Sequence, residues 1–431
     1  MSTSRVAVVG LGKIGLPLAA QIAGKGHTVI GCDLQQTVVD SINAGHNHIV
    51  EEPGLGEAVS AVVEAGRLRA TTDTKATVRE SDVAIVIVPV VVDSAKRPDY
   101  RWLDLALEAV GKGLHRGALV IVETTLPVGA TRGHVAPILE RESSLRAGQD
   151  FYVAFSPERV SSGTALLDLA RYPKIVGGLD PESTKRAVEF YRSVLDAEVR
   201  AVSNAETAEF SKLAETTYRD VNIALANQFA LYAGARGVDA TEAFSAANSQ
   251  PYSHIHSPGI GVGGHCIPVY PHFLLTDSAN GELELVRDAR EVNDGMAARC
   301  VGWLRKALGS LAGKRVLVLG LSYRSDVKEL AFSTAMSVID LLRREGAVVL
   351  ANDPHFTSEE LAHLEVELVD LSKDVDVDAV IVQAVHREYR ELDWSRFHGL
   401  RVVLDGRGAL DGAALREKGV ELISVAQPPR S

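Results

Sequence analysis

The segment that most constrains the fold of this chain lies at its start, where a β-branched run leads directly into three closely spaced glycines. Residues 6–9 are Val-Ala-Val-Val, and the turn that follows is Gly10-Leu11-Gly12-Lys13-Ile14-Gly15. A helix-favouring apolar stretch comes next. In such a unit the first glycine allows a tight bend, the second lets the backbone approach a pyrophosphate, and the third lets the helix pack closely on the strand. The segment therefore predicts the opening of a doubly wound α/β sheet with a dinucleotide at its edge.

An acidic residue strengthens the dinucleotide interpretation. Asp33 ends the second predicted strand, at roughly the 20-residue distance at which a carboxylate accepts hydrogen bonds from a ribose. A negative charge there repels a 2′-phosphate, so the pattern favours NAD over NADP. We assign to this NAD site the residues Gly10, Gly12, Lys13, Ile14, Gly15 and Asp33. The alternative is a glycine turn of the same form that binds nothing.

Length and composition set the broad class. The 431 residues exceed one ordinary core and predict two or three domains. A hydrophobic content of 46% with 23% charged residues is typical of a soluble globular protein. The formal net charge of −11 offers no basic surplus for phosphates. We therefore expect neither a nucleic acid nor a membrane as a partner.

The N-terminal sequence shows no targeting signal, and this feature and the cysteine usage lead us to expect the cytoplasm. The N-terminus runs straight into a strand, without the basic region and long apolar stretch of a signal peptide. The longest apolar runs, such as Val83–Val88, are far shorter than the roughly 20 residues of a membrane helix. The three cysteines, Cys32, Cys266 and Cys300, cannot all pair, which suits a reducing compartment.

The secondary-structure pattern divides the chain into three regions. Residues 1–203 alternate short strands with amphipathic helices, and residues 311–431 do so again. Residues 204–310 are mostly helical and begin with one long helix over 204–235, suited to a dimer interface. We expect an α/β fold in which a central helical domain joins two doubly wound, Rossmann-like parallel-sheet domains. The expected strands are 6–9, 28–32, 83–88, 119–123, 152–155, 174–178, 198–202, 314–320, 347–350, 379–383 and 402–404.

The candidate nucleophile lies in a glycine-dense loop that ends at Cys266. Four glycines at 259–264 permit positive φ angles and a close approach of the backbone to a ligand. The thiol can add to an aldehyde, and the thiohemiacetal can then lose a hydride to become a thioester. Two other interpretations stay open. One is a metal site with His254, His256 and His265, although the spacing matches no common zinc pattern. The other is a buried structural cysteine. We expect no metal.

Hydrolysis of a thioester needs a carboxylate base and donors for an oxyanion. Glu158 follows a predicted strand at the carboxyl edge of the first sheet and is the candidate base. Lys212 lies on the long helix, where it can assist deprotonation and stabilise an oxyanion. Thr216, Arg219 and Asn222 share its face by spacing. This face is either functional or a solvated polar stripe, and spacing alone does not separate the two.

The third region offers a basic turn after its first strand. Arg324 and Lys328 follow the strand that ends at Gly320, without a glycine triplet. Such a turn suits a phosphate-bearing ligand other than a dinucleotide. One sheet is therefore expected to bind the cofactor and the other the substrate.

Five motifs follow one another along the chain: GLGKIGLPLA at 10–19, ETTLPVG at 123–129, SPERV at 156–160, AEFSKLAETTYRDVNIALAN at 208–227 and PGIGVGGHCIPV at 258–269. In this order and spacing they resemble the UDP-glucose/GDP-mannose dehydrogenase family, the nucleotide-sugar 6-dehydrogenases. The resemblance covers nearly the whole chain. SPERV and RDVNIALAN are most similar to the branch that acts on UDP-N-acetylhexosamines.

The resemblance implies oxidation of a sugar C6 alcohol to a carboxylate with two NAD, through a cysteine thioester. It makes Cys266 the nucleophile, Glu158 the hydrolytic base and Lys212 the acid/base or oxyanion partner. Thr125 would help place the water and, with Pro89, belong to the NAD site. The substrate-binding residues that it implies are Glu158, Arg159, Val160, Lys212, Arg219, Asn222, Tyr252, Gly263, Tyr323 and Arg324. Family members are usually homodimers or higher homo-oligomers, joined through the long central helix.

Four positions depart from the family pattern. Thr216 stands where the family usually carries an asparagine, and Tyr270 where it carries an aspartate. Tyr252 and Ala331 fall near or at positions where arginines are usual. We expect a four-electron dehydrogenase of a UDP- or TDP-linked hexose or N-acetylhexosamine. The alternatives are a two-electron dehydrogenase and a catalytically silent protein that binds NAD and a nucleotide sugar.

Overall fold

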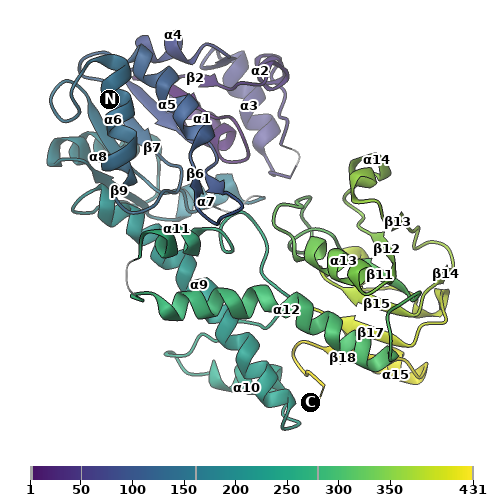
Figure 1. Ribbon diagram of the computed structural model, residues 1–431. Helices are drawn as coiled ribbons and strands as arrows, with labels where there is room; N and C mark the ends of the chain where they lie inside the picture. The colour runs from purple at the N-terminus through teal and green to yellow at the C-terminus, as the bar shows by residue number, and fades with distance from the viewer. Residues whose placement is uncertain (1–2, 50, 161–162, 279–280, 430–431) are drawn as a thin grey trace. The chain divides into compact units, whose positions relative to one another are not determined.

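The computed structural model describes residues 3–49, 51–160, 163–278 and 281–429 (Figure 1). The chain forms two compact units. The first comprises Met1–Glu215 with His272–Asp277, and the second comprises Thr216–Pro271 with Ser278–Ser431. Each unit contains one large, mostly parallel sheet.

The first unit is built on an eight-stranded sheet with the order β10-β9-β8-β7-β4-β1-β2-β3. Its strands are β1 (Arg5–Val9), β2 (Thr28–Cys32), β3 (Leu68–Thr71), β4 (Val83–Val86), β7 (Leu119–Val122), β8 (Tyr152–Phe155), β9 (Lys174–Gly178) and β10 (Val199–Ala201). From β3 to β8 all neighbours are parallel, so their carboxyl ends share one edge. The strand order reverses between β1 and β4. At such a point the carboxyl edge of an α/β sheet binds its ligand.

Helices cover both faces of this sheet because strands and helices alternate along the chain. One face packs against α1 and α8, and helices α4, α5 and α6 pack together on the other. The helices of this unit are α1 (Gly15–Gly24), α2 (Gln36–Asn43), α3 (Leu55–Glu64), α4 (Thr74–Arg79), α5 (Arg101–Gly113), α6 (Ala136–Ser143), α7 (Ala165–Arg171) and α8 (Pro181–Val194). A short hairpin of β5 (Val91–Val92) and β6 (Pro98–Asp99) and a π-helical turn, η1 (Thr131–Val135), complete it.

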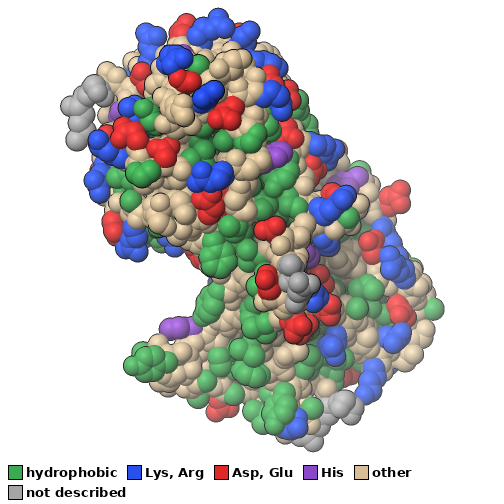
Figure 2. All heavy atoms as spheres, turned by 60° about the vertical axis from the view of Figure 1, so that its left-hand side comes forward, with side chains coloured by type: hydrophobic (Ala, Val, Ile, Leu, Met, Phe, Trp, Pro, Cys, Tyr) green, Lys and Arg blue, Asp and Glu red, His purple; other side chains and the backbone are tan. Residues whose placement is uncertain are grey.

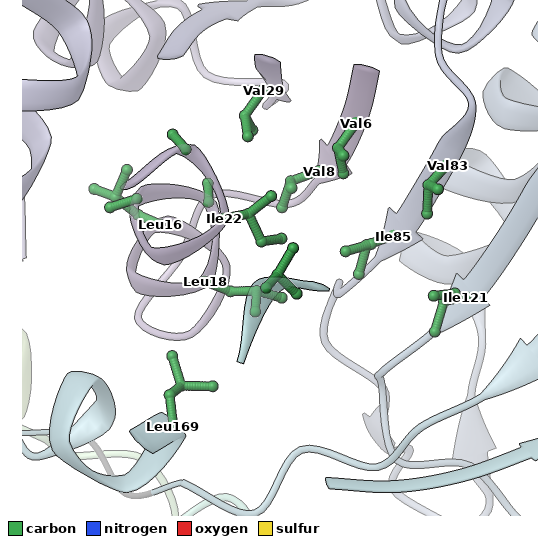
Figure 3. Close-up of a cluster of buried hydrophobic side chains, with 14 of the residues drawn as sticks. Val6, Val8, Leu16, Leu18, Ile22, Val29, Val83, Ile85, Ile121 and Leu169 are labelled. Carbon is green, nitrogen blue, oxygen red and sulfur yellow. The ribbon is translucent and has the colours of Figure 1, made fainter. Parts of the chain in front are cut away.

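Alternate residues of the central strands form the core beneath α1. Val6, Val8 and Ile85 point to one face because successive side chains of a strand alternate. They pack with Leu18 and Ile22 of α1, and all five side chains are fully buried (Figure 3). This packing fixes the start of α1, and with it the glycine turn, above the end of β1.

β9 and β10 run opposite to the other strands of the first sheet. Phe155 of β8 lies opposite Gly177 of β9 in antiparallel register. Extending this register by three residues places Lys174, the first residue of β9, opposite Glu158. The reversal therefore brings the start of β9 to the edge where β7 and β8 end.

The second unit contains a six-stranded parallel sheet with the order β13-β12-β11-β15-β17-β18. Its strands are β11 (Arg315–Leu319), β12 (Val348–Asn352), β13 (Glu367–Leu368), β15 (Ala379–Val382), β17 (Val402–Asp405) and β18 (Glu421–Ser424). Smaller elements are the pair β14 (Val375–Asp376) and β16 (Phe397–His398), with α13 (Thr334–Arg344), α14 (Ser358–Leu361), α15 (Ala413–Glu417), η2 (Ala362–Leu364), η3 (Arg387–Tyr389) and η4 (Trp394–Arg396).

Four helices lie between the two sheets in the sequence. They are α9 (Ala205–Gly234), α10 (Ala240–Ala247), α11 (Tyr270–Asp277) and α12 (Glu284–Leu308). Within the second unit, α9 and α12 are joined by a buried polar cluster. Arg290 Nη1 donates to Asp220 Oδ1 at 2.5 Å, and Asn293 Nδ2 donates to the same oxygen at 2.8 Å.

The structure confirms the predicted α/β class with two Rossmann-like sheets and a helical region between them. The long helix predicted over 204–235 is α9 (Ala205–Gly234). The division into domains 1–203, 204–310 and 311–431 stays a prediction. In the described residues we find no helix long and apolar enough to cross a membrane. Basic and acidic side chains are interspersed on the face shown in Figure 2.

Candidate active site

The glycine turn after β1 has the geometry of a cofactor cradle. Gly10 has a φ of +97°, and a side chain there would meet the Ile87 carbonyl oxygen at 2.5 Å. A Cβ on Gly15 would lie 1.9 Å from the Gly10 carbonyl oxygen, so α1 can approach the turn only with glycine at this position. A Cβ on Gly12 would meet no atom within 4 Å. The turn thus leaves open space above its second glycine, where the backbone can approach a pyrophosphate.

Asp33 holds the same turn from the end of β2. Its carboxylate accepts hydrogen bonds from the backbone N–H of Leu11 and of Gln35, each at 3.0 Å. Lys13, within the turn, forms an ion pair with Glu51 at 3.8 Å. His48 lies beside Asp33, and burial lowers the pKa of its imidazole. No sequence pattern singles out His48, since its place depends on the fold of the segment after α2.

The loop after β7 is fixed to both the sheet and the long helix. Thr124 Oγ1 donates to the carbonyl oxygen of Val88, beside Pro89, at 2.7 Å. Thr125 follows it and is 5% exposed. Further along, the Glu209 carboxylate of α9 accepts the N–H groups of Gly129 and Thr131 at 2.6 and 2.7 Å. Glu209 thus anchors this loop one helical turn before Lys212.

Glu158 is immobilised by neighbours from three directions. Its Oε1 accepts the backbone N–H groups of Arg159 and Val160 at 2.6 and 3.0 Å, and its Oε2 accepts Lys174 Nζ at 2.7 Å. Burial raises the pKa of this carboxyl, but the Lys174 ammonium and these hydrogen bonds outweigh burial and lower the pKa to about 2. A cavity of about 10 Å³, room for about one water molecule, borders both side chains.

The predicted face of the long helix divides into residues of different environment. Lys212 is half-buried, Thr216 is buried and Arg219 is exposed. The Asn222 amide is engaged with the chain itself, because Nδ2 donates to the His254 carbonyl oxygen at 2.6 Å and Oδ1 accepts the His256 N–H at 3.0 Å. The helix face is therefore neither a uniform solvated stripe nor a uniform binding surface. Lys212 belongs to the same unit as Glu158, and Cys266 belongs to the other unit.

SPERV is also tied to the long helix. Arg159 Nε donates to Glu215 Oε2 at 2.8 Å, three residues after Lys212 on α9. The structure thereby brings Glu158, Arg159, Val160 and the first part of α9 into one connected region of the first unit. The predicted hydrolytic base, Glu158, and the predicted lysine, Lys212, both belong to this region.

Cys266 is exposed at the end of its loop, so the interpretation as a buried cysteine is wrong. The loop is held against the turn that follows β11. A Cβ on Gly263 would lie 2.7 Å from Tyr323 Cβ and 2.8 Å from the Phe332 carbonyl oxygen. Gly264, with a φ of +93°, donates its N–H to the Ala331 carbonyl oxygen at 3.2 Å. Glycine is needed at 263 because the loop packs closely on its own chain.

Two further residues hold this loop. Asn227 Oδ1 accepts the Gly259 N–H at 2.8 Å, and the Arg407 guanidinium donates to the carbonyl oxygens of Gly261 and Tyr323 at 3.3 and 3.4 Å. Sequence reasoning missed Arg407. Its signal is the Asp405-Gly406-Arg407 run at the end of β17, the carboxyl edge of the second sheet.

The other predicted substrate-binding residues of the second unit differ in exposure. Tyr323 is half-buried against the loop, and the exposed Arg324 guanidinium lies 5.8 Å from its ring centroid. Tyr252 is 93% exposed. The Cys266 carbonyl oxygen accepts the N–H of Tyr270, the residue that departs from the family pattern, at 2.9 Å.

Among the described residues, one His/Asp/Glu/Cys group has metal-like spacing, and it consists of Asp326, His355 and His386. It does not include Cys266. His386 Nδ1 accepts the Asp326 N–H at 2.9 Å, and His386 Nε2 lies 3.1 Å from Asp353 Oδ2. Both ring nitrogens of His386 are therefore occupied by the chain, and we assign this group a structural role.

The sequence is similar to known proteins over nearly its whole length. The sequence matches three domains of the UDP-glucose/GDP-mannose dehydrogenase family: the NAD binding domain over residues 4–195, the central domain over 206–295 and the UDP binding domain over 317–412. It is 37% identical over 415 residues to a UDP-N-acetyl-D-mannosamine dehydrogenase of Pyrococcus horikoshii, covering 94% of this chain and 96% of that protein.

Two more relatives extend the comparison. An NDP-N-acetyl-D-galactosaminuronic acid dehydrogenase of Ralstonia nicotianae is 36% identical over 411 residues, covering 94% of this chain and 95% of that protein. The solved structure of a UDP-D-ManNAc dehydrogenase from Pyrococcus horikoshii superposes with a TM-score of 0.88 at 34% identity, covering 98% of this chain and 99% of that one.

Proposed function

Since the chain belongs to the UDP-glucose/GDP-mannose dehydrogenase family and is an NAD-dependent dehydrogenase, we propose that it oxidises the C6 alcohol of a nucleotide-linked sugar to a carboxylate in two successive steps. The substrate class is a UDP- or TDP-linked hexose, with an N-acetylhexosamine favoured. Two relatives that align over nearly the whole chain are named for N-acetylated sugars, which supports this choice.

NAD+, which the glycine turn and Asp33 would hold, would accept one hydride from C6 in each oxidation, while the Lys212 amine takes the proton of the C6 hydroxyl. The Cys266 thiolate adds to the aldehyde carbonyl and forms the C–S bond of a thiohemiacetal, which the second oxidation converts to a thioester. Water then forms a C–O bond at the carbonyl, and the C–S bond breaks to return the thiolate. Glu158 takes the proton from that water, and Lys212 stabilises the oxygen that becomes negative.

NAD and the sugar nucleotide bind to different sets of residues. The turn at Gly10–Gly15 and Asp33 bind NAD, with Pro89 and Thr125 beside it. The residues that we assign to the sugar nucleotide are Arg159, Val160, Arg219, Asn222, Gly263, Tyr323 and Arg324. The exposed Arg324 guanidinium supplies the positive charge that a diphosphate needs.

We also propose that the working form is a homodimer or higher homo-oligomer. The long helix α9 exposes several aromatic side chains: Phe210, Tyr218, Phe229 and Tyr232. Apolar surface of this kind on one helix is typical of a protein interface. The three free cysteines suit a reducing compartment, the cytoplasm.

The observation that carries the proposal is the exposed thiol of Cys266, on a loop held by Tyr323 and Arg407, in a chain with an NAD turn. The test is a panel of UDP-, TDP- and GDP-linked sugars with NAD, followed by NADH absorbance. We expect turnover with a UDP- or TDP-linked sugar. Loss of carboxylate formation in Cys266→Ser would support the thioester, whereas full four-electron turnover by that variant would exclude it.

A further inference from the structure

Two carboxylates share one ammonium group at the carboxyl edge of the first sheet. Lys174 Nζ donates to Glu123 Oε2 at 2.8 Å and to Glu158 Oε2 at 2.7 Å. Lys174 is 5% exposed and Glu123 is 1% exposed. Two ionised carboxylates with one ammonium would leave a net negative charge almost without water, which is costly unless one carboxylate takes up a proton.

Glu123 is the carboxylate suited to take up that proton. Burial raises the pKa of Glu123 to about 7, against the opposing effect of Lys174. The Tyr191 hydroxyl of α8 donates to Glu123 Oε1, and Lys174 Nζ lies 5.1 Å from the centroid of the Tyr191 ring. Glu158 is less deeply buried than Glu123. Its side chain is 12% exposed, and its Oε1 accepts two backbone N–H groups. Glu158 therefore stays ionised while Glu123 titrates near neutral pH.

We infer that Lys174 and Glu123 are positioning residues for Glu158. Lys174 holds the Glu158 carboxylate in place at the carboxyl edge of the first sheet, and Glu123 governs how strongly Lys174 holds that carboxylate. The inference rests on the proposed function, in which Glu158 takes a proton from the water that cleaves the Cys266 thioester. The side chains that face Glu123 are Lys174 from β9, Glu158 from the loop after β8 and Tyr191 from α8.

The arrangement predicts whether the rate of thioester hydrolysis rises or falls as the pH increases. Below the pKa of Glu123, Glu158 is the ionised carboxylate of the two beside Lys174, and the ammonium charge keeps Glu158 a weak base. Above that pKa, the ionised Glu123 competes for Lys174 and adds negative charge beside Glu158. Glu158 then accepts a proton more readily, so thioester hydrolysis should accelerate as the pH rises through about 7. Because the groups interact strongly, this ionisation belongs to the network and not to one side chain.

The test separates hydrolysis from hydride transfer. Both hydride transfers precede hydrolysis, so a variant slow only in hydrolysis forms two NADH per site in a burst and accumulates a thioester on Cys266. Stopped-flow absorbance with NAD and UDP-N-acetyl-D-mannosamine, together with intact-protein mass spectrometry, follows both quantities. The variants are Glu123→Gln and Lys174→Met. The matched controls, Glu182→Gln and Lys185→Met, remove an exposed ion pair on α8.

We expect Glu123→Gln to keep the burst and to abolish the rise of the steady-state rate between about pH 6 and about pH 8. We expect Lys174→Met to keep the burst, lower the steady-state rate by about 100-fold and accumulate the Cys266 adduct, because loss of the contact that positions Glu158 outweighs the gain in its basicity. Both controls should behave as the unmodified protein does. An unchanged pH profile in Glu123→Gln overturns the inference, as does equal loss of burst and steady-state rate in a folded Lys174→Met. Should Lys174→Met not fold, the isosteric Glu123→Gln decides alone.

Glu158→Gln distinguishes this inference from the proposed function. If the unmodified protein forms two NADH per sugar and Glu158→Gln accumulates the thioester, while Glu123→Gln and Lys174→Met match the unmodified protein, only the inference fails. If the unmodified protein forms neither NADH nor a Cys266 adduct with the sugar panel, the proposed function fails and the inference fails with it.

Discussion

Among the glycines of the cysteine loop, Gly263 packs against both a side chain and the backbone of the segment after β11. A methyl group there would lie 2.7 Å from Tyr323 Cβ and 2.8 Å from the Phe332 carbonyl oxygen, so the loop must move to accept it. We predict that Gly263→Ala lowers kcat by about 100-fold, because the displaced Cys266 thiol no longer lies where it can add to the aldehyde carbonyl. Steady-state kinetics on the folded variant measure the loss.

Gly295 provides the control for this substitution. It lies within α12, and a Cβ there would meet no atom within 4 Å. Gly295→Ala should leave kcat unchanged and stabilise the helix by about 1 kcal/mol. Wild-type activity in Gly263→Ala would show that the close packing on Tyr323 does not position Cys266.

A substitution of Asp33 tests whether this residue sets the preference for NAD over NADP. In Asp33→Ala the Leu11 N–H loses its acceptor and a bound ribose loses another. Each hydrogen bond to a charged group contributes about 1.5–3 kcal/mol, so we expect the KM for NAD to rise roughly 10- to 100-fold. The preference for NAD over NADP should narrow, because the carboxylate that repels a 2′-phosphate is gone. Initial rates with both cofactors measure this, and an unchanged preference would contradict the assignment.

Residues carried by a local motif could be predicted from the sequence, whereas residues paired through the fold could not. Cys266 and Asp33 stand in short patterns whose chemistry is local. Lys174 opens an ordinary-looking strand, and only the antiparallel register of β9 places it opposite Glu158. Arg407 contacts the cysteine loop from the turn after β17, more than a hundred residues later; the Asp405-Gly406-Arg407 run marks the turn but does not reveal which loop it contacts.

At the scale of elements, the packing of α9 on α12 depends on one buried ion pair. Asp220 is 0% exposed and accepts hydrogen bonds from Arg290 and Asn293. Removal of the Asp220 carboxylate leaves the buried Arg290 guanidinium with the half-exposed Asp294 as its remaining partner and Asn293 without its carboxylate acceptor. We predict that Asp220→Ala lowers the free energy of unfolding by about 1–3 kcal/mol, measured by urea denaturation.

An exposed ion pair gives the comparison for that prediction. Arg305 of α12 pairs with Glu345 at 2.9 Å, and 55% of the Arg305 side chain is exposed. Arg305→Ala should cost less than about 1 kcal/mol. Equal effects of Asp220→Ala and Arg305→Ala would mean that the buried cluster does not stabilise the contact between α9 and α12.

Most of the strands that the sequence predicted have apolar runs. β2, β8 and β9 begin and end at the predicted residues. β4 and β7 end two and one residues early, at Val86 and Val122, because the chain leaves the sheet there to form the loops at its carboxyl edge. β3 and β18 were not predicted; both lie at sheet edges and mix buried with exposed or half-buried residues in short runs, although β10, an edge strand of the same kind, was predicted over 198–202.

For the whole molecule, the central claim is a four-electron oxidation carried out by one chain with two NAD. The first unit contains the NAD turn and the Glu158 network, and the second contains the thiol and the basic turn at Arg324. A protein that stops at the aldehyde has no use for the thioester or for its hydrolysis. The number of hydrides removed from each sugar therefore distinguishes the two accounts.

The decisive measurement is the molar ratio of NADH formed to sugar consumed when a limiting amount of the active nucleotide sugar is oxidised to completion with excess NAD. We predict a ratio of two, because the alcohol and then the thiohemiacetal at Cys266 each lose one hydride. The product should be the carboxylate, and no free aldehyde should accumulate. A ratio of one, with an aldehyde or ketone as the product, would contradict the account.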